Sequence, residues 1–164
     1  MSQTKPTPEY EEIRERCLGL LARREHSRRE LLRKLKQRGF DCTAVADVVL
    51  DDLEEQGLLS EVRFAESFVR ARIESGHGPL KIRAGLQERG VASTTVNQAL
   101  CDDRSTWRAR CRETWEKRFG VPPEDRSEFA RQTRFLASRG FDSEDIRAVL
   151  QEVGTADENN EQSE

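Results

Sequence analysis

Apolar and aromatic side chains are scarce in this sequence. Apolar residues make up 35% and aromatic residues 6% of the 164 positions, whereas charged residues make up 36%. No apolar run is long enough to span a bilayer, and the first residues, MSQTKPTPEYEE, lack the apolar stretch of a signal peptide. This scarcity argues against a membrane protein and against a thick-layered α/β domain. It favours a cytoplasmic, helical protein with many exposed faces.

Patterns typical of metal sites and disulfide frameworks are absent as well. No C-x-x-C spacing joins the four cysteines, which are Cys17, Cys42, Cys101 and Cys111. The only histidines are His26, just before a predicted helix start, and His77, between two glycines. We expect both to be exposed loop residues rather than general bases. We also expect reduced thiols and no zinc site.

Catalytic motifs are missing from the chain. There is no G-x-x-x-x-G-K-[ST] phosphate loop, no G-x-G-x-x-G and no G-x-S-x-G turn. The one acidic cluster with ligand-like spacing is Asp51-Asp52-x-Glu54, and acidic helix surfaces of this kind are common. The sequence therefore predicts a protein that binds rather than catalyses, without a metal, a cofactor or a small-molecule substrate.

The charge is unevenly distributed, although its net value is only -3. Residues 1–40 carry a net charge of +5, and residues 67–100 and 101–139 carry +3 each. Residues 41–66 and 140–164 carry -7 each. The basic stretches can face an anionic partner, or they are ordinary solvated helix surfaces.

An internal repeat organises the sequence. The hexapeptides LKQRGF, LQERGV and LASRGF place glycines at positions 39, 90 and 140, which are 51 and 50 residues apart. An apolar residue follows each glycine by six positions, and another by ten. Each glycine suits the left-handed position that ends a helix, where the next apolar residue covers the leucine of the last turn. The repeated element is therefore predicted to be a helix cap rather than a catalytic site.

The remaining periodicity is helical throughout. We predict an all-α fold of three tandem three-helix repeats that form an elongated, curved array. The predicted boundaries are residues 1–58, 59–104 and 105–153, followed by a disordered acidic tail over residues 154–164. Helix starts are expected at Thr7-Pro8 and at Ser27, where Glu30 completes a capping box. A second glycine cap is expected at Gly57, with Leu58 over Leu53.

Two basic sets are candidates for partner or nucleic-acid binding. In the second predicted helix the leucines mark the buried side, so Arg29, Arg33 and Lys36 fall on the opposite face. Arg28 adjoins this set. The second set consists of Arg70, Arg72, Lys81 and Arg83. Such faces suit phosphates or acidic protein surfaces, but lysine and arginine are also simply good exposed helix formers.

Several segments of the chain together resemble a known family. They are residues 24–35 (REHSRRELLRKL), 57–72 (GLLSEVRFAESFVRAR) and 76–82 (GHGPLKI), followed by the second cap hexapeptide. The third repeat contributes Trp107, Phe119-Gly120 and the last cap hexapeptide. Over residues 10–152 the chain resembles the RecX family, regulators of the bacterial recombinase RecA.

The resemblance implies a protein without catalytic activity of its own that binds RecA filaments on single-stranded DNA. It implies inhibition of filament growth and of the recombinase, ATPase and co-protease activities that depend on the filament, in DNA repair and the SOS response. Contact with single-stranded or duplex DNA through the basic faces is a further expectation. Two alternatives remain, a helix-turn-helix-like DNA-binding protein without a recombinase partner and a purely structural helical scaffold.

Overall fold

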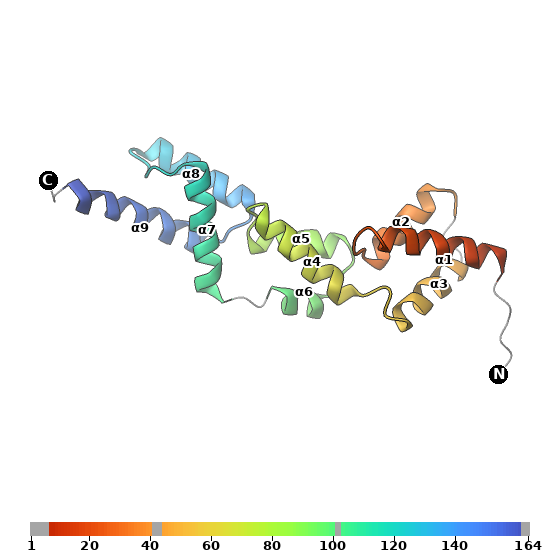
Figure 1. The fold of residues 1–164 in the computed structure, drawn as a ribbon. Helices are drawn as coiled ribbons and strands as arrows, with labels where there is room; N and C mark the ends of the chain where they lie inside the picture. Colours follow the sequence, from red (N-terminus) through yellow and green to blue (C-terminus); the bar gives the residue numbers. More distant parts are fainter. Residues whose placement is uncertain (1–6, 41–43, 101–102, 162–164) are drawn as a thin grey trace. The chain divides into compact units, whose positions relative to one another are not determined.

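The computed structural model describes residues 7–40, 44–100 and 103–161, and this part of the chain forms nine α-helices and no strand (Figure 1). The helices are α1 (Pro8–Leu21), α2 (Arg28–Gln37), α3 (Ala44–Glu55), α4 (Glu61–Glu74), α5 (Pro79–Glu88), α6 (Ser93–Ala99), α7 (Arg104–Arg118), α8 (Arg126–Arg139) and α9 (Ser143–Glu161). The prediction of an all-α repeat protein is confirmed.

The three repeated glycines end their helices as predicted. Gly39, Gly90 and Gly140 have φ of +86°, +76° and +92°. In α2 the N–H of Phe40 donates to the Leu35 carbonyl at 3.2 Å, and the N–H of Gly39 donates to the Lys36 carbonyl at 3.1 Å. The same pair of bonds closes α5 and α8. This is the Schellman pattern, which satisfies carbonyls that a helix end otherwise leaves unpaired.

The cap at Gly57 has the predicted backbone but a different apolar contact. Gly57 has φ +68°, and the N–H groups of Leu58 and Leu59 donate to the Leu53 carbonyl at 2.9 and 3.0 Å. Leu58 is 41% exposed, whereas Leu59 is 3% exposed and belongs to the core around Leu53. The prediction that Leu58 covers Leu53 is therefore wrong, because the chain turns one residue further before it enters the core.

Two of the predicted helix starts are confirmed. The hydroxyl of Thr7 accepts a hydrogen bond from the Tyr10 N–H at 3.2 Å, with Pro8 in the first turn of α1. The hydroxyl of Ser27 accepts one from the Glu30 N–H at 3.1 Å at the start of α2. In both cases a side-chain oxygen satisfies an N–H that has no partner within its helix.

The chain packs as two compact units. The N-terminal unit comprises Met1–Ser67 and Leu86–Ala99, and the C-terminal unit comprises Phe68–Gly85 and Leu100–Glu164. The N-terminal unit buries side chains of α1, α2 and α3, among them Ile13, Leu31 and Val49. In the C-terminal unit α7 packs across α9 and against α8 (Figure 1). Its interior is partly polar, because the buried indole N–H of Trp115 donates to the side-chain oxygen of Gln132 at 2.7 Å.

The last helix is longer than the sequence predicted. We expected a disordered tail to begin at residue 154, but α9 continues to Glu161. Gly154 is not among the glycines with positive φ, and a Cβ atom placed there would meet nothing within 4 Å. It therefore lies in the helix without capping it. The boundaries drawn between the three repeats stay a prediction.

Candidate functional site

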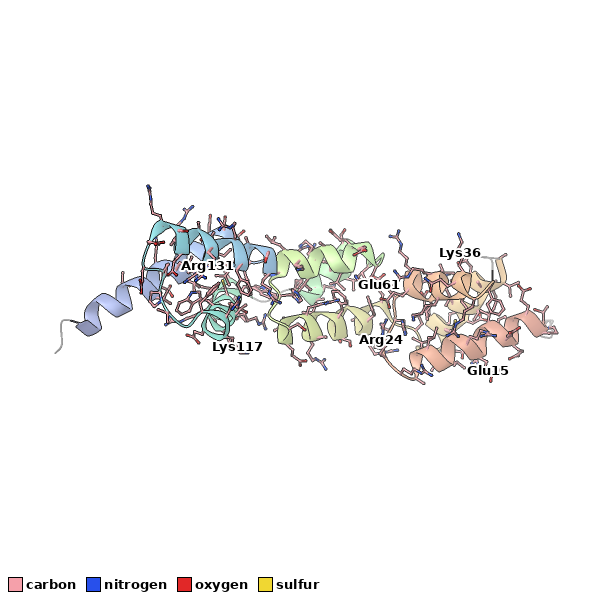
Figure 2. The ribbon with its side chains drawn as sticks, turned by 90° about the horizontal axis from the view of Figure 1, so that it is seen from above. Glu15, Arg24, Lys36, Glu61, Lys117 and Arg131 are labelled. Atoms are coloured by element: carbon pink, nitrogen blue, oxygen red, sulfur yellow. The ribbon has the colours of Figure 1, made fainter. Side chains whose placement is uncertain are left out.

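The first predicted basic face lines a single hollow in the N-terminal unit. Arg29, Arg33 and Lys36 are exposed on α2 and line it together with Leu32 and Arg89. Lys36 points away from α1 (Figure 2). Two glutamates, Glu30 and Glu88, also line the hollow. Arg89 is paired with Glu30 at 3.3 Å, which leaves three exposed basic side chains around the depression. They can attract an anionic partner, although binding at this face stays a prediction.

Arg28 lies next to this set in sequence but is engaged elsewhere. Its guanidinium forms ion pairs with Asp47, Asp51 and Glu54 of α3, at 3.1, 2.7 and 3.4 Å. The side chain is 31% exposed. These carboxylates offset its charge, so Arg28 contributes little to the attraction of an anionic partner. All three acidic residues of the cluster Asp51-Asp52-x-Glu54 are thus engaged. Asp51 and Glu54 pair with Arg28, and Asp52 accepts a hydrogen bond from the Tyr10 hydroxyl.

The second predicted basic set does not share one environment. Arg70 is exposed, whereas Arg72 is half-buried with its guanidinium 4.9 Å from the centre of the Phe68 ring. The Lys81 ammonium group donates to the Ser138 carbonyl at 3.1 Å, and Arg83 is half-buried. Of these four residues, Arg70 and Lys81 are exposed.

The sequence did not reveal a cluster of paired charges around Glu30 in the N-terminal unit. The Glu30 carboxylate is 5% exposed and accepts hydrogen bonds from Arg24 at 3.0 Å and Arg89 at 3.3 Å. The Nδ1 atom of His26 lies 3.0 Å from the same carboxylate. Glu30 was predicted only as part of a capping box. Nothing local indicates that Arg89, far along the chain, completes its environment.

His26 is not an exposed loop residue, and this prediction is wrong. It is 3% exposed, because its ring turns inward towards Glu30. Burial, followed by the charge of Arg24, lowers the pKa of His26, and the bond to Glu30 opposes the shift. His77 is half-buried, and burial together with the charges of Lys81 and Arg139 lowers its pKa as well.

We expect the N-terminal unit to lose stability as the pH falls from about 7 to about 4. Burial favours a higher pKa for the Glu30 carboxyl, but the bonds and charges of Arg24 and His26 lower it overall. Both His26 and Glu30 therefore have folded-state pKa values below their ordinary 6.5 and 4.5. Below those values the unfolded chain binds more protons than the folded chain. The stabilisation is complete above the ordinary pKa and is lost as the pH falls through the folded one.

Denaturant midpoints across this pH range, followed by circular dichroism, test the expectation. His26→Gln keeps a polar side chain but cannot titrate, so its profile should lose the part of the slope that begins below about pH 6.5. Parallel profiles for the parent and His26→Gln would show that this histidine does not couple stability to pH.

The thiols of the two described cysteines are unsuited to nucleophilic attack and to metal binding. Cys17 and Cys111 are fully buried, and burial raises the pKa of Cys17 to about 11 and that of Cys111 to about 12. Both therefore stay protonated near neutral pH, and a protonated thiol is a poor nucleophile and metal ligand. Cys42 and Cys101 lie outside the described residues. Among the described residues no group of three or more His, Cys, Asp or Glu side chains is placed to hold a metal ion.

None of the described helices combines the length and the apolar character that crossing a bilayer requires.

The helices, caps and basic hollow define a class, that of all-α tandem-repeat proteins with charged surfaces. Sequence comparison gives the family. The domain models of RecX match in order: the first three-helix domain over residues 14–53, the second over 60–100 and the third over 108–150.

Named relatives of the chain point to the same family as the domain models. The regulatory protein RecX of Halorhodospira halophila is 47% identical over 152 residues, which are 92% of this chain and 92% of that protein. The regulatory protein RecX of Pseudomonas putida strain KT2440 is 48% identical over 139 residues, or 84% of this chain and 88% of that protein. The chain belongs to the RecX family, as the resemblance of its motifs indicated.

Solved structures show the same fold. A crystal structure of regulatory protein RecX superposes with a TM-score of 0.73 at 20% identity, covering 92% of this chain and 82% of its own. RecX from Lactobacillus salivarius gives 0.71 at 19% identity, covering 89% of this chain and 97% of its own. At such identities the likeness concerns the fold alone.

Proposed function

We propose that this chain regulates the recombinase RecA by binding its filaments on single-stranded DNA, in DNA repair and the SOS response. Binding slows filament growth and so reduces recombinase, ATPase and co-protease activity. The observation that carries the proposal is the presence of all three RecX domains, in order, in a chain nearly half identical to proteins named as regulators.

The regulator acts by binding and not by a reaction of its own. Three groups of residue types that serve in catalysis are otherwise engaged. The His26 ring is paired with a buried carboxylate, the Cys17 thiol is protonated, and the Asp47–Asp51 carboxylates hold Arg28. This supports a partner-binding role.

The hollow on α2 is the surface that we assign to the filament. Arg29, Arg33 and Lys36 are exposed there, whereas Arg89, which also lines the hollow, is paired with Glu30. Their arrangement suits DNA phosphates or an acidic protein groove, both of which a nucleoprotein filament offers. The same basic hollow also supports the second candidate function, helix-turn-helix-like binding of duplex DNA without a recombinase.

A co-sedimentation experiment separates these functions. The chain is mixed side by side with RecA filaments on single-stranded DNA, with naked single-stranded and duplex DNA, and with free RecA. We expect it to sediment with the filaments at concentrations where the other partners retain little. Equal or stronger retention by naked duplex DNA would favour the second candidate and contradict the first.

A further inference from the structure

A buried carboxylate contacts both the first and the second repeat where the two meet. Glu30 accepts hydrogen bonds from Arg89, which directly precedes the cap glycine of α5, and lies beside Nδ1 of His26 in the turn before α2. One buried carboxylate thus satisfies an imidazole of one repeat and an arginine of the next. Both partners are polar groups whose burial would be costly without it.

The corresponding position in the next repeat carries the opposite charge. When Gly39 is aligned with Gly90, His77 replaces His26, but Lys81 replaces Glu30. Arg139 precedes Gly140 as Arg89 precedes Gly90. The imidazole and the arginine are therefore kept in the C-terminal unit, and the carboxylate between them is lost.

The structure shows the consequence of that loss. Nδ1 of His77 is buried and has no hydrogen-bond partner within the described ranges. The ammonium group of Lys81 turns to the Ser138 carbonyl, and the guanidinium of Arg139 donates to the Ser75 carbonyl at 3.2 Å. His77 and Arg139 line one pocket, which we call the His77 pocket. A buried nitrogen without a hydrogen-bond partner is unfavourable, and an acceptor beside it would remove that cost.

Cations predominate around the His77 pocket. Besides Arg139, its lining includes Arg110, Lys117 and Arg118, against two carboxylates, Glu74 and Glu113. Glu113 already accepts a hydrogen bond from Lys117 at 2.6 Å. The remaining charge is positive and suits an anion.

Aromatic stacking on a nucleobase is not supported. The Phe135 ring, which lines the pocket, has the guanidinium groups of Arg118 and Arg139 at 5.7 and 5.2 Å from its centre. It also meets the Phe119 ring edge-on at 5.3 Å. Proteins that bind single-stranded nucleic acids stack the bases on open aromatic faces, and Phe135 does not provide such a face. The comparison of the His77 pocket with the surroundings of Glu30 favours a carboxylate ligand instead.

We propose that the His77 pocket binds a carboxylate side chain from an acidic peptide segment of a partner protein, in the place that Glu30 fills at the first junction. The carboxylate accepts from Nδ1–H of the neutral His77 ring and from Arg139. The His77 pocket and the α2 hollow have no lining residue in common, so failure of this proposal leaves the proposed function untouched.

The test restores the missing carboxylate within the chain. Lys81→Glu places an internal carboxylate at the position of Glu30, where it competes for the pocket, whereas Lys81→Gln removes the same charge without adding an acceptor. The probe is a fluorescein-labelled hexaglutamate peptide, with a hexaglutamine peptide as the neutral control. We expect the parent and Lys81→Gln to bind hexaglutamate and Lys81→Glu to bind it about tenfold more weakly, which corresponds to about 1.4 kcal/mol.

Two further comparisons secure the interpretation. Arg126→Glu and Arg126→Gln make the same changes of charge at an exposed position of α8 and should differ little from each other. If Lys81→Glu proves unfolded by circular dichroism, His77→Phe decides instead, and it should lose hexaglutamate binding. Equal hexaglutamate binding by Lys81→Glu and Lys81→Gln, or by His77→Phe and the parent, would overturn the proposal. The proposal would also be overturned if Lys81→Glu weakened the binding of inorganic phosphate or of an oligothymidylate but not the binding of hexaglutamate.

Discussion

Replacing Gly140 by alanine is expected to destabilise the C-terminal unit by about 3 kcal/mol, whereas the same change at Gly39 costs the N-terminal unit about 1 kcal/mol. The two glycines have similar φ values, +92° and +86°, so the backbone strain of a Cβ atom is the same in both. Their surroundings differ. A Cβ at Gly140 would lie 2.5 Å from the backbone nitrogen of Lys81, but at Gly39 it would meet nothing within 4 Å.

The two effects can be measured in one set of denaturant titrations. Both tryptophans, Trp107 and Trp115, belong to the C-terminal unit, so their fluorescence follows that unit, while circular dichroism follows both. Gly140→Ala should lower the fluorescence midpoint strongly, and Gly39→Ala should leave that midpoint unchanged. Similar losses of free energy at the two positions would show that strain alone matters and that Gly140 does not lie close to Lys81.

Reversing the basic face of α2 should weaken filament binding by about tenfold or more while leaving the fold intact. Arg29, Arg33 and Lys36 are exposed, and exposed charges contribute under about 0.5 kcal/mol each to stability. The triple variant Arg29→Glu/Arg33→Glu/Lys36→Glu removes up to three phosphate contacts. The slope of log affinity against log salt concentration should therefore fall in magnitude by about 2 to 3.

The control makes the same change of net charge on another surface. Arg126→Glu/Arg134→Glu/Arg147→Glu alters three exposed arginines of α8 and α9. Filament affinity at two salt concentrations, with melts to confirm folding, compares the two triples with the parent. The acidic residues of α3 are unsuitable as a control because Asp51 is paired with Arg28. If the α2 triple is folded and binds like the parent, its basic face is only solvated surface.

Features set by neighbouring residues were predictable from the sequence. The glycine caps depend on a conformation that only a residue without a Cβ adopts readily, and on an apolar neighbour in the next position. Gly39, Gly90 and Gly140 were therefore recognisable, and so were the side-chain caps of Thr7 and Ser27. The shared face of Arg29, Arg33 and Lys36 followed from helical geometry alone.

Features that depend on distant residues were not predictable in this way. His26 is buried because Glu30 and Arg89, far apart in the chain, meet beside it. The close approach of Lys81 to Gly140 has no local signal either. At Gly57 the pattern predicted the cap but chose the wrong leucine, because either Leu58 or Leu59 can follow the turn into the core.

ATP hydrolysis by RecA filaments on single-stranded DNA, measured as the chain is added, tests the central claim most directly. We predict that the steady-state rate falls with increasing chain and that the chain alone hydrolyses no ATP. A rate that stays unaltered at saturating chain, with filaments intact, would contradict the assignment of this protein as a regulator of RecA.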